Sequence, residues 1–362
     1  MRRATDAQAA DGGGGGGDGG GTAAGGAGTS SQTGPRKWIA LGLSMLGIAL
    51  LGLAAFTAVG SARGLADATE AIGKLRWWHV AIACGVPTCN FFLTSLIFWL
   101  LTVRGLPLIA PCARGIAYRE MLALITSGTL LNQLPGKPGI VGRTLYHKFI
   151  TGIPIRFTLL VMLQAVALGS IGVLLCMAIG IAWAGAGWAA GAGGLAAVAL
   201  ATAWGYWGVM RRGLAHATLR HVGLVVIGIR VCETMLWSLR YWVMLDVAGR
   251  PVGVAEAGII AAASQMAILL PIQVGLREWT VGIVAGLLAH DGGVGLSGSM
   301  SETATRQGLL ADLLCRGADL AVMVPAGLLA SWLVYQSIAL ARLSTGGAGG
   351  VAVAGGGAAT QK

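Results

Sequence analysis

The chain has 362 residues, of which 55% are hydrophobic and 11% are charged, and its formal net charge is +11. A mean hydropathy of +0.75 excludes an ordinary soluble domain. Because Lys and Arg in a membrane protein first report its orientation, the positive charge does not predict a nucleic-acid partner. The sequence predicts an all-α membrane protein, a polytopic helical bundle.

The two ends of the chain differ in composition from its middle. Residues 1–35 are mainly Gly, Ala, Ser and Thr, which cannot bury enough apolar surface to offset the loss of chain entropy. Residues 343–362 are similar. We therefore expect disordered tails at 1–35 and 343–362 around one polytopic transmembrane domain at 36–342.

Six segments are apolar enough to span a membrane, which takes about 20 residues across a hydrocarbon core of roughly 30 Å. They are, in chain order, Trp38–Gly60, Trp77–Val103, Phe157–Trp183, Trp188–Met210, Leu224–Val247 and Leu309–Leu340. The small-residue pair Gly187 and Gly191 is given little weight as an association motif, because Gly and Ala are frequent throughout the chain.

Two further apolar stretches, Tyr118–Leu134 and Val254–His290, are interrupted by proline, glycine and charge. Proline removes a backbone donor and glycine permits close backbone approach, so a helix opens at such positions. Open backbone is tolerated at membrane depth only inside protein or beside a wet cavity. We therefore interpret both stretches as broken, re-entrant hairpins.

The distribution of Lys and Arg predicts the orientation of the chain. If six helices span and each hairpin returns to its own side, one face holds 16 of these residues, the other holds 6, and 3 lie within helices. The richer face contains both termini. The positive-inside rule then places both termini in the cytoplasm of a multi-pass cell-membrane protein. The first hairpin enters from the cytoplasm and the second from outside.

The two interrupted stretches resemble each other. Residues 127–144 read SGTLLNQLPGKPGIVGRT and residues 263–280 read ASQMAILLPIQVGLREWT. Each has an apolar run, Leu-Pro, a glycine, and an arginine that opens the next segment. Together with their opposite sides, this similarity predicts an inverted repeat, an arrangement in which transporters place their substrate near the midplane between broken helices.

The residue types in both hairpins favour an anionic ligand. Amide side chains can satisfy opened backbone, and Lys, Arg and helix N-termini attract a phosphate or carboxylate. The candidate binding residues are Asn132, Gln133, Pro135, Lys137, Gly139, Arg143, Gln265, Pro271, Gly275, Arg277 and Glu278. The alternative is that both stretches are surface loops whose basic residues contact lipid headgroups generically.

Charged residues also occur inside two predicted spans. They are Arg230, Glu233, Arg240, Asp312, Arg316 and Asp319. Each is costly in lipid and should face the bundle interior, where the helical spacing gathers them. They form either a self-neutralised network that joins two helices, or a polar path that contacts a headgroup or couples its movement to protons.

The sequence predicts no metal site and no cofactor. The six cysteines form no C-x-x-C pair and are expected to be packing residues, and two of the five histidines, His216 and His221, suit a solvated loop.

The chain from about Trp38 to Leu340 resembles the lysylphosphatidylglycerol synthase transmembrane region, a family of flippase-like integral membrane proteins. The similar patterns are LNQLPGKPGIVGRTLYHKF, LLPIQVGLREW and CRGADLAVMVPAG. They match at Asn132, Pro135, Gly139 and Arg143, at Pro271, Gly275, Arg277 and Glu278, and at Arg316, Pro325 and Gly327. The acidic residue common between glycine and arginine in the first pattern is absent, since Ile140 and Val141 stand there.

The resemblance implies that the protein handles membrane lipids, by translocating an anionic, modified or isoprenoid-linked lipid. We expect no enzymatic activity. The alternatives are a non-catalytic membrane subunit that recruits a separate lipid-modifying or glycosyl-transferring enzyme, and an enzyme acting on polyprenyl lipids, which would want clustered acidic metal ligands. If Arg143 and Arg277 hold the headgroup, replacing either by Gln should abolish transport and leave the protein stable.

Overall fold

The computed structural model describes residues 52, 55, 62–109, 116–133, 137–212, 219–269, 275–289 and 301–348, and these residues contain helices and no strand. The α-helices are α2 (Ala62–Lys74), α3 (Trp77–Ile109), α4 (Tyr118–Leu131), α5 (Pro138–Tyr146), α6 (Ile155–Ala186), α7 (Trp188–Arg212), α8 (Leu219–Val247), α9 (Val254–Leu269), α10 (Leu276–Leu288) and α11 (Glu302–Ala348). The predicted all-α class is confirmed.

Five of the predicted spans are helices long and apolar enough to cross a membrane. They are Trp77–Val103, Ile155–Ala186, Trp188–Arg212, Arg220–Val247 and Glu302–Ala339. The sixth predicted span, Trp38–Gly60, lies outside the described residues apart from residues 52 and 55. Helix α11 ends at Ala348, six residues beyond the predicted domain boundary at residue 342. The rest of that tail and all of the first tail lie outside the described residues.

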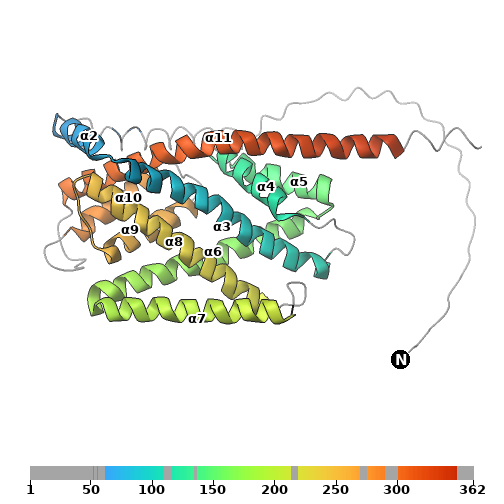
Figure 1. The fold of residues 1–362 in the computed structure, drawn as a ribbon, viewed down its shortest axis with the longest axis horizontal. Coiled ribbons are helices and arrows are strands. Elements are labelled where there is room, and N and C mark those ends of the chain that lie inside the picture. Colours follow the sequence, from blue (N-terminus) through green and yellow to red (C-terminus); the bar gives the residue numbers. More distant parts are fainter. Residues whose placement is uncertain are drawn as a thin grey trace, which may run out of the picture.

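Two pairs of short helices pack on each other, α4 with α5 and α9 with α10. The predicted stretch Tyr118–Leu134 covers only α4 of the first pair, because α5 begins after it, at Pro138, whereas Val254–His290 covers both α9 and α10. We call these pairs the first and the second hairpin. Their helices have 14, 9, 16 and 13 residues, or about 14 to 24 Å at 1.5 Å per residue, less than the thickness of a hydrocarbon core. The first hairpin lies toward one end of the bundle and the second toward the other (Figure 1).

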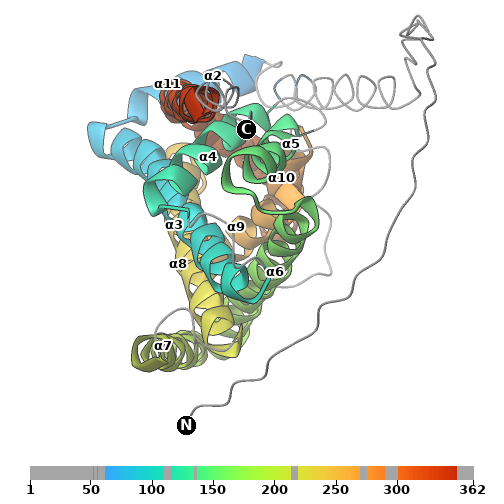
Figure 2. The same ribbon diagram turned by 90° about the vertical axis from the view of Figure 1, so that its right-hand side faces the viewer.

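The long helices form the frame around the hairpins. Seen along the bundle, α11 and α7 lie at opposite edges, with α3, α6 and α8 between them (Figure 2). Helix α7 packs on α6 and α8, whereas α11 packs on α10, α4, α3 and α8. Helix α11 therefore contacts both hairpins, and residues along its length are the ones that can join them.

Glycines lie where helices approach each other most closely. A Cβ atom at Gly308 of α11 would lie 2.6 Å from the Cβ of Ala285 and 3.1 Å from the Cα of Gly282, both on α10. A Cβ at Gly191 would overlap the ring of Trp183 across the α6–α7 turn. Small residues let helix backbones approach in this way. The Gly187 and Gly191 pair, which the sequence analysis discounted, thus includes a packing position.

The largest cluster of buried apolar side chains joins α8, α9, α10 and α11. Its members include Tyr241, Met244 and Leu245 from α8, Ile260 from α9 and Val281 from α10, all at most 2% exposed. Buried charged side chains from the same helices lie beside this cluster, which excludes water from them. Electrostatic interactions there are stronger than in water.

Candidate functional site

Helix α11 carries three charged side chains on one face, at the spacing that the sequence predicted. Asp312, Arg316 and Asp319 follow each other after four and three residues, which places them on one stripe. Asp312 is fully buried and Asp319 is 4% exposed. Charges buried this deeply are costly unless other charges or hydrogen bonds compensate them. The residues that pair with these three side chains therefore determine which of the charges remain available for a ligand.

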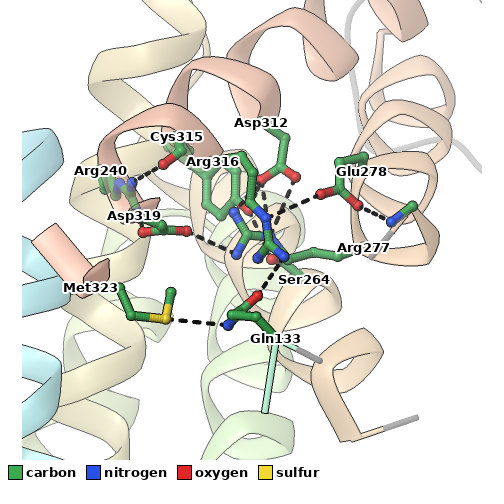
Figure 3. A network of polar contacts seen from close by, with 12 residues as sticks. Gln133, Arg240, Ser264, Arg277, Glu278, Asp312, Cys315, Arg316, Asp319 and Met323 are labelled. Carbon is green, nitrogen blue, oxygen red and sulfur yellow. Dashed lines mark hydrogen bonds and ion pairs between the residues drawn. The ribbon is translucent and has the colours of Figure 1, made fainter. Parts of the chain in front are cut away.

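Arg277, at the start of α10, joins the two aspartates of this stripe (Figure 3). Its Nη2 donates to Oδ1 of Asp312 at 2.9 Å, and its Nη1 donates to Oδ2 of Asp319 at 3.1 Å. Arg240 of α8 donates to the other oxygen of Asp319 at 2.6 Å and also to the carbonyl of Cys315. Both arginines are therefore held and neutralised by aspartates.

Hydroxyl groups from two further positions complete the surroundings of Asp312. The phenol of Tyr241 on α8 donates a hydrogen bond to Oδ1 of Asp312. The same phenol oxygen lies 2.7 Å from the hydroxyl of Ser264 on α9. Helices α8, α9, α10 and α11 thus share one hydrogen-bonded cluster, and charge-assisted bonds of this kind are the stronger ones.

Glu278 follows Arg277 in the chain but is bonded differently. Its Oε2 accepts a hydrogen bond of 2.7 Å from the backbone N–H of Gly275, which caps the N-terminus of α10. Gly275 has φ +87°, a backbone conformation that favours glycine. The second oxygen, Oε1, is buried without a hydrogen bond, and Nε of Arg316 lies 3.9 Å from it. One carboxylate oxygen thus anchors the helix and the other faces Arg316.

Gln133, which follows α4 at the tip of the first hairpin, contacts the same arginine. Its Oε1 accepts a hydrogen bond from Nη2 of Arg316, and its Nε2 lies 3.3 Å from the sulfur of Met323. Figure 3 shows Gln133 and Glu278 approaching Arg316 from different elements. Arg316 is therefore the point at which both hairpins meet. We call this set the central network: Gln133, Arg240, Tyr241, Ser264, Arg277, Glu278, Asp312, Arg316 and Asp319.

The central network contains three arginines and three acidic residues, but their charges are shared unequally. The two aspartates lie within 3.1 Å of Arg240 or Arg277. Arg316 has its nearest described carboxylate at 3.9 Å, and its side chain is 13% exposed. Among the described residues of the network, Arg316 is the cation with the weakest compensation. It is the one best able to hold an added anion.

Polar atoms without a partner also lie in the two hairpins. Asn132 Oδ1 in the first hairpin, and Gln265 Nε2 and Glu278 Oε1 in the second, are buried and make no hydrogen bond. Leaving a buried polar group unsatisfied costs about 1–3 kcal/mol. All three residues are candidates from the sequence. Their side chains can still accept or donate a hydrogen bond to a polar ligand.

Other predicted binding residues lie outside the central network. The guanidinium of Arg143, on α5, lies 4.0 Å from the centre of the Phe98 ring on α3. Lys137 precedes α5 in the left-handed conformation, with φ 49°. Gly139 packs against the backbone of Gly128, so the two helices of the first hairpin touch there. The structure thus separates Arg143 from Arg277, which the sequence had treated as equivalent.

Arg230 and Glu233 form a pair of their own. Nη1 of Arg230 donates to Glu233 at 2.6 Å, and the Arg230 side chain covers Gly169 and Gly172 of α6. The described contacts do not join this pair to the central network. It fits a local ion pair within α8, packed against α6, better than a continuous path. Pro135 and Pro271, also predicted, lie outside the described residues.

Sequence reasoning missed several members of the site. Tyr241, Ser264 and Met323 are neutral side chains in apolar helices, and nothing in their spacing distinguishes them from packing residues. The one available signal is that Tyr241 adjoins Arg240, because a charge buried in a span requires polar neighbours.

The described cysteines are free thiols, Cys112 lies outside the described residues, and no three described His, Cys, Asp or Glu side chains gather to hold a metal ion. Comparison with protein-family models, curated proteins and solved structures finds no match to this chain.

Proposed function

We propose that this chain moves an anionic, modified or isoprenoid-linked lipid between the leaflets of the cell membrane. One observation carries the proposal. Gln133 from the first hairpin and Glu278 from the second both approach Arg316, in a bundle whose long helices are apolar enough to cross a membrane. Transporters with broken helices place substrate at such a junction.

In this proposal the two hairpins are re-entrant and form an inverted repeat, with both termini in the cytoplasm. Their helices are too short to span, and they lie toward opposite ends of the bundle (Figure 1). Basic residues support the orientation. From residue 121 to residue 232 the chain contains eight Lys or Arg and no Asp or Glu. Seven of the eight lie in or beside the first hairpin or between the last turn of α7 and the start of α8, and the positive-inside rule favours the cytoplasm for these segments.

Arg316 is the proposed contact for the lipid phosphate. A guanidinium offers several N–H donors in a plane, which suits a phosphate, and this one lacks a close carboxylate. Gln133 and Asn132 at the first tip, and Glu278 at the second, supply polar groups around the headgroup. Arg277 and Arg240 have a different role, because their charges hold the aspartates and with them the helices.

The proposal is tested by lipid flipping in liposomes. Purified protein is reconstituted with fluorescent anionic or zwitterionic lipid, and dithionite reports the label that reaches the outer leaflet. The wild-type protein should flip at least one anionic lipid. Arg316→Gln should abolish flipping, because the amide cannot neutralise a phosphate.

A matched control lies on the same helix. Arg306 forms an i,i+4 pair with Glu302, whose side chain is 79% exposed, and it is not a member of the central network. Arg306→Gln therefore removes the same charge without touching Arg316 or its partners, and this variant should flip lipid normally. Flipping retained by Arg316→Gln, or lost equally in both variants, would reject Arg316 as the site. No flipping of any lipid tested would favour the subunit that recruits a lipid-modifying or glycosyl-transferring enzyme, which co-purification would identify.

A further inference from the structure

A second cluster of basic and aromatic side chains lies where α7 ends and α8 begins, at the other end of α8 from Arg240 and Tyr241 of the central network. It surrounds a pocket of about 360 Å³, which we call the α7–α8 pocket. The residues that line it are Trp204, Trp207, Gly208, Arg211, Arg212 and His221. The end of α7 and the start of α8 lie at the same end of the bundle as the first hairpin (Figure 1).

Aromatic rings, rather than carboxylates, hold the arginines of this pocket. The guanidinium carbon of Arg211 lies 4.6 Å from the centre of the Trp207 ring. Nη1 of Arg212 lies 3.3 Å from Nδ1 of His221, whose ring centre lies 5.0 Å from that of Trp204 with the two rings tilted by 36°. A stacked guanidinium keeps the N–H groups at its edge available for an oxyanion.

Charge in this part of the chain is uncompensated. Among the described residues no carboxylate lies within salt-bridge distance of Arg211, Arg212 or the neighbouring Arg220, and residues 121–232 include no Asp or Glu at all. An added anion would therefore meet positive charge without a competing acidic side chain. A phosphate group satisfies this requirement, because its oxygens accept bonds from more than one guanidinium.

The shape of the pocket depends on a glycine. Gly208 lies against His221, and a Cβ atom there would overlap the imidazole ring. Gly205, one turn earlier, would similarly bring a Cβ to 2.8 Å from the Cβ of Leu224. These glycines let α8 approach α7 closely enough for His221 to form one wall. The cluster is thus built by packing of two helices and is not a chance gathering of surface charge.

Exposure around the pocket identifies the source of the anion. Trp204 and Trp207 are 42% and 54% exposed, and Met210 is 64% exposed, although α7 is apolar enough to span a membrane. Helix α7 also lies at the edge of the bundle (Figure 2). Of the long helices in the described part of the chain, α6 and α8 are the ones that pack on it. Its exposed face meets lipid, where Trp and Arg at helix ends contact headgroups.

We propose that the α7–α8 pocket binds the phosphate of an anionic phospholipid whose acyl chains lie along the exposed face of α7. This site is separate from Arg316, and lipid can bind it whether or not the protein translocates anything. A phospholipid bound here would tie the end of α7 to the start of α8. The inference therefore concerns binding, and it does not depend on the proposed function.

Native mass spectrometry of the detergent-purified protein tests it. The protein is titrated with phosphatidylglycerol or with phosphatidylcholine, and bound lipid is counted. One phosphatidylglycerol should bind in preference, and Arg211→Gln with Arg212→Gln should weaken it about tenfold or more, because charge-assisted bonds are lost. The control, Lys148→Gln with Arg156→Gln, removes two exposed charges near the first hairpin and should keep the preference.

Three results would overturn the assignment. The wild-type protein would show no preference for phosphatidylglycerol over phosphatidylcholine. The control pair would lose the preference as completely as the pocket pair, which would show a general effect of charge. Glycerol 3-phosphate, which has no acyl chains, would displace phosphatidylglycerol at equal concentration, which would make the ligand a soluble phosphate ester.

Discussion

Replacing Arg277 by Gln should destabilise the protein strongly, in contrast to the expectation from sequence alone that this variant stays stable. Arg277 donates to both Asp312 and Asp319, and the three side chains are between 0% and 5% exposed. Without Arg277, Asp312 keeps Tyr241 as its hydrogen-bond donor and Asp319 keeps Arg240. One carboxylate is then buried without a matching cation, which costs about 3–5 kcal/mol.

This loss is large enough to measure by thermal unfolding. For a domain of more than 150 residues, 1 kcal/mol shifts the midpoint by roughly 2–4 °C, so the variant should melt roughly 6–20 °C lower. Intrinsic tryptophan fluorescence of the protein in detergent is a suitable signal, since the Trp237 ring centre lies 5.5 Å from the Arg277 guanidinium.

The neighbouring residue provides the control. Glu278→Gln removes a charge that is equally buried, but Oε1 makes no hydrogen bond and Arg316 lies 3.9 Å away. The amide oxygen of Gln can still accept the bond from the N–H of Gly275 that caps α10. The Glu278→Gln substitution should therefore lower the free energy of unfolding by less than about 1 kcal/mol. Equal melting midpoints of the two variants, or a larger loss of stability in Glu278→Gln, would refute the assignment of a structural role to Arg277 and a ligand-binding role to Glu278.

Two further predictions concern packing and topology. Gly308→Ala should destabilise the protein by about 1–3 kcal/mol, because the added Cβ would meet Ala285 across the α10–α11 contact. A Cβ at Gly317 on the same helix meets nothing within 4 Å, so Gly317→Ala should be neutral or stabilising. Equal melting midpoints of the two variants would contradict this prediction. In a variant lacking native cysteines, single cysteines at Ala117 and Arg156, which flank the first hairpin, should be labelled from the same side of the membrane, and labelling from opposite sides would show that the hairpin crosses.

Much of the helical frame follows from sequence, because span length and hydropathy are local properties. The predicted span Trp77–Val103 begins where α3 begins, and proline and glycine marked both hairpin breaks. Helix α2, Ala62–Lys74, was missed because it is only 13 residues long and amphipathic, with Leu65 and Ile72 exposed. Which helices become neighbours depends on close approach at particular glycines, and a chain with 60 glycines does not reveal which ones pack.

The sequence predicts which residue types form the site, but it does not predict which side chains pair with each other. Asp312 and Asp319 were expected to face inward, and they do, since a charge in a span has few alternatives. Arg143 and Arg277 occupy similar positions in two similar patterns, yet one stacks on the Phe98 ring and the other bridges two aspartates. The difference lies in the facing helix, because α5 meets an aromatic ring on α3 and α10 meets the acidic stripe of α11.

The two hairpins are attached to α11 with unequal strength, and this bears on how a lipid could move. The second hairpin is held through the ion pairs of Arg277, whose rupture costs about 3–5 kcal/mol. The stronger polar tie of the first is the bond from Arg316 to Gln133, worth about 1.5–3 kcal/mol as a bond to a charged group, beside the weaker contact of Gln133 with the sulfur of Met323. A phosphate that takes the guanidinium of Arg316 replaces Gln133 and leaves Arg277 in place. On the proposed function, headgroup binding therefore weakens the attachment of the first hairpin to α11, while the second stays fixed.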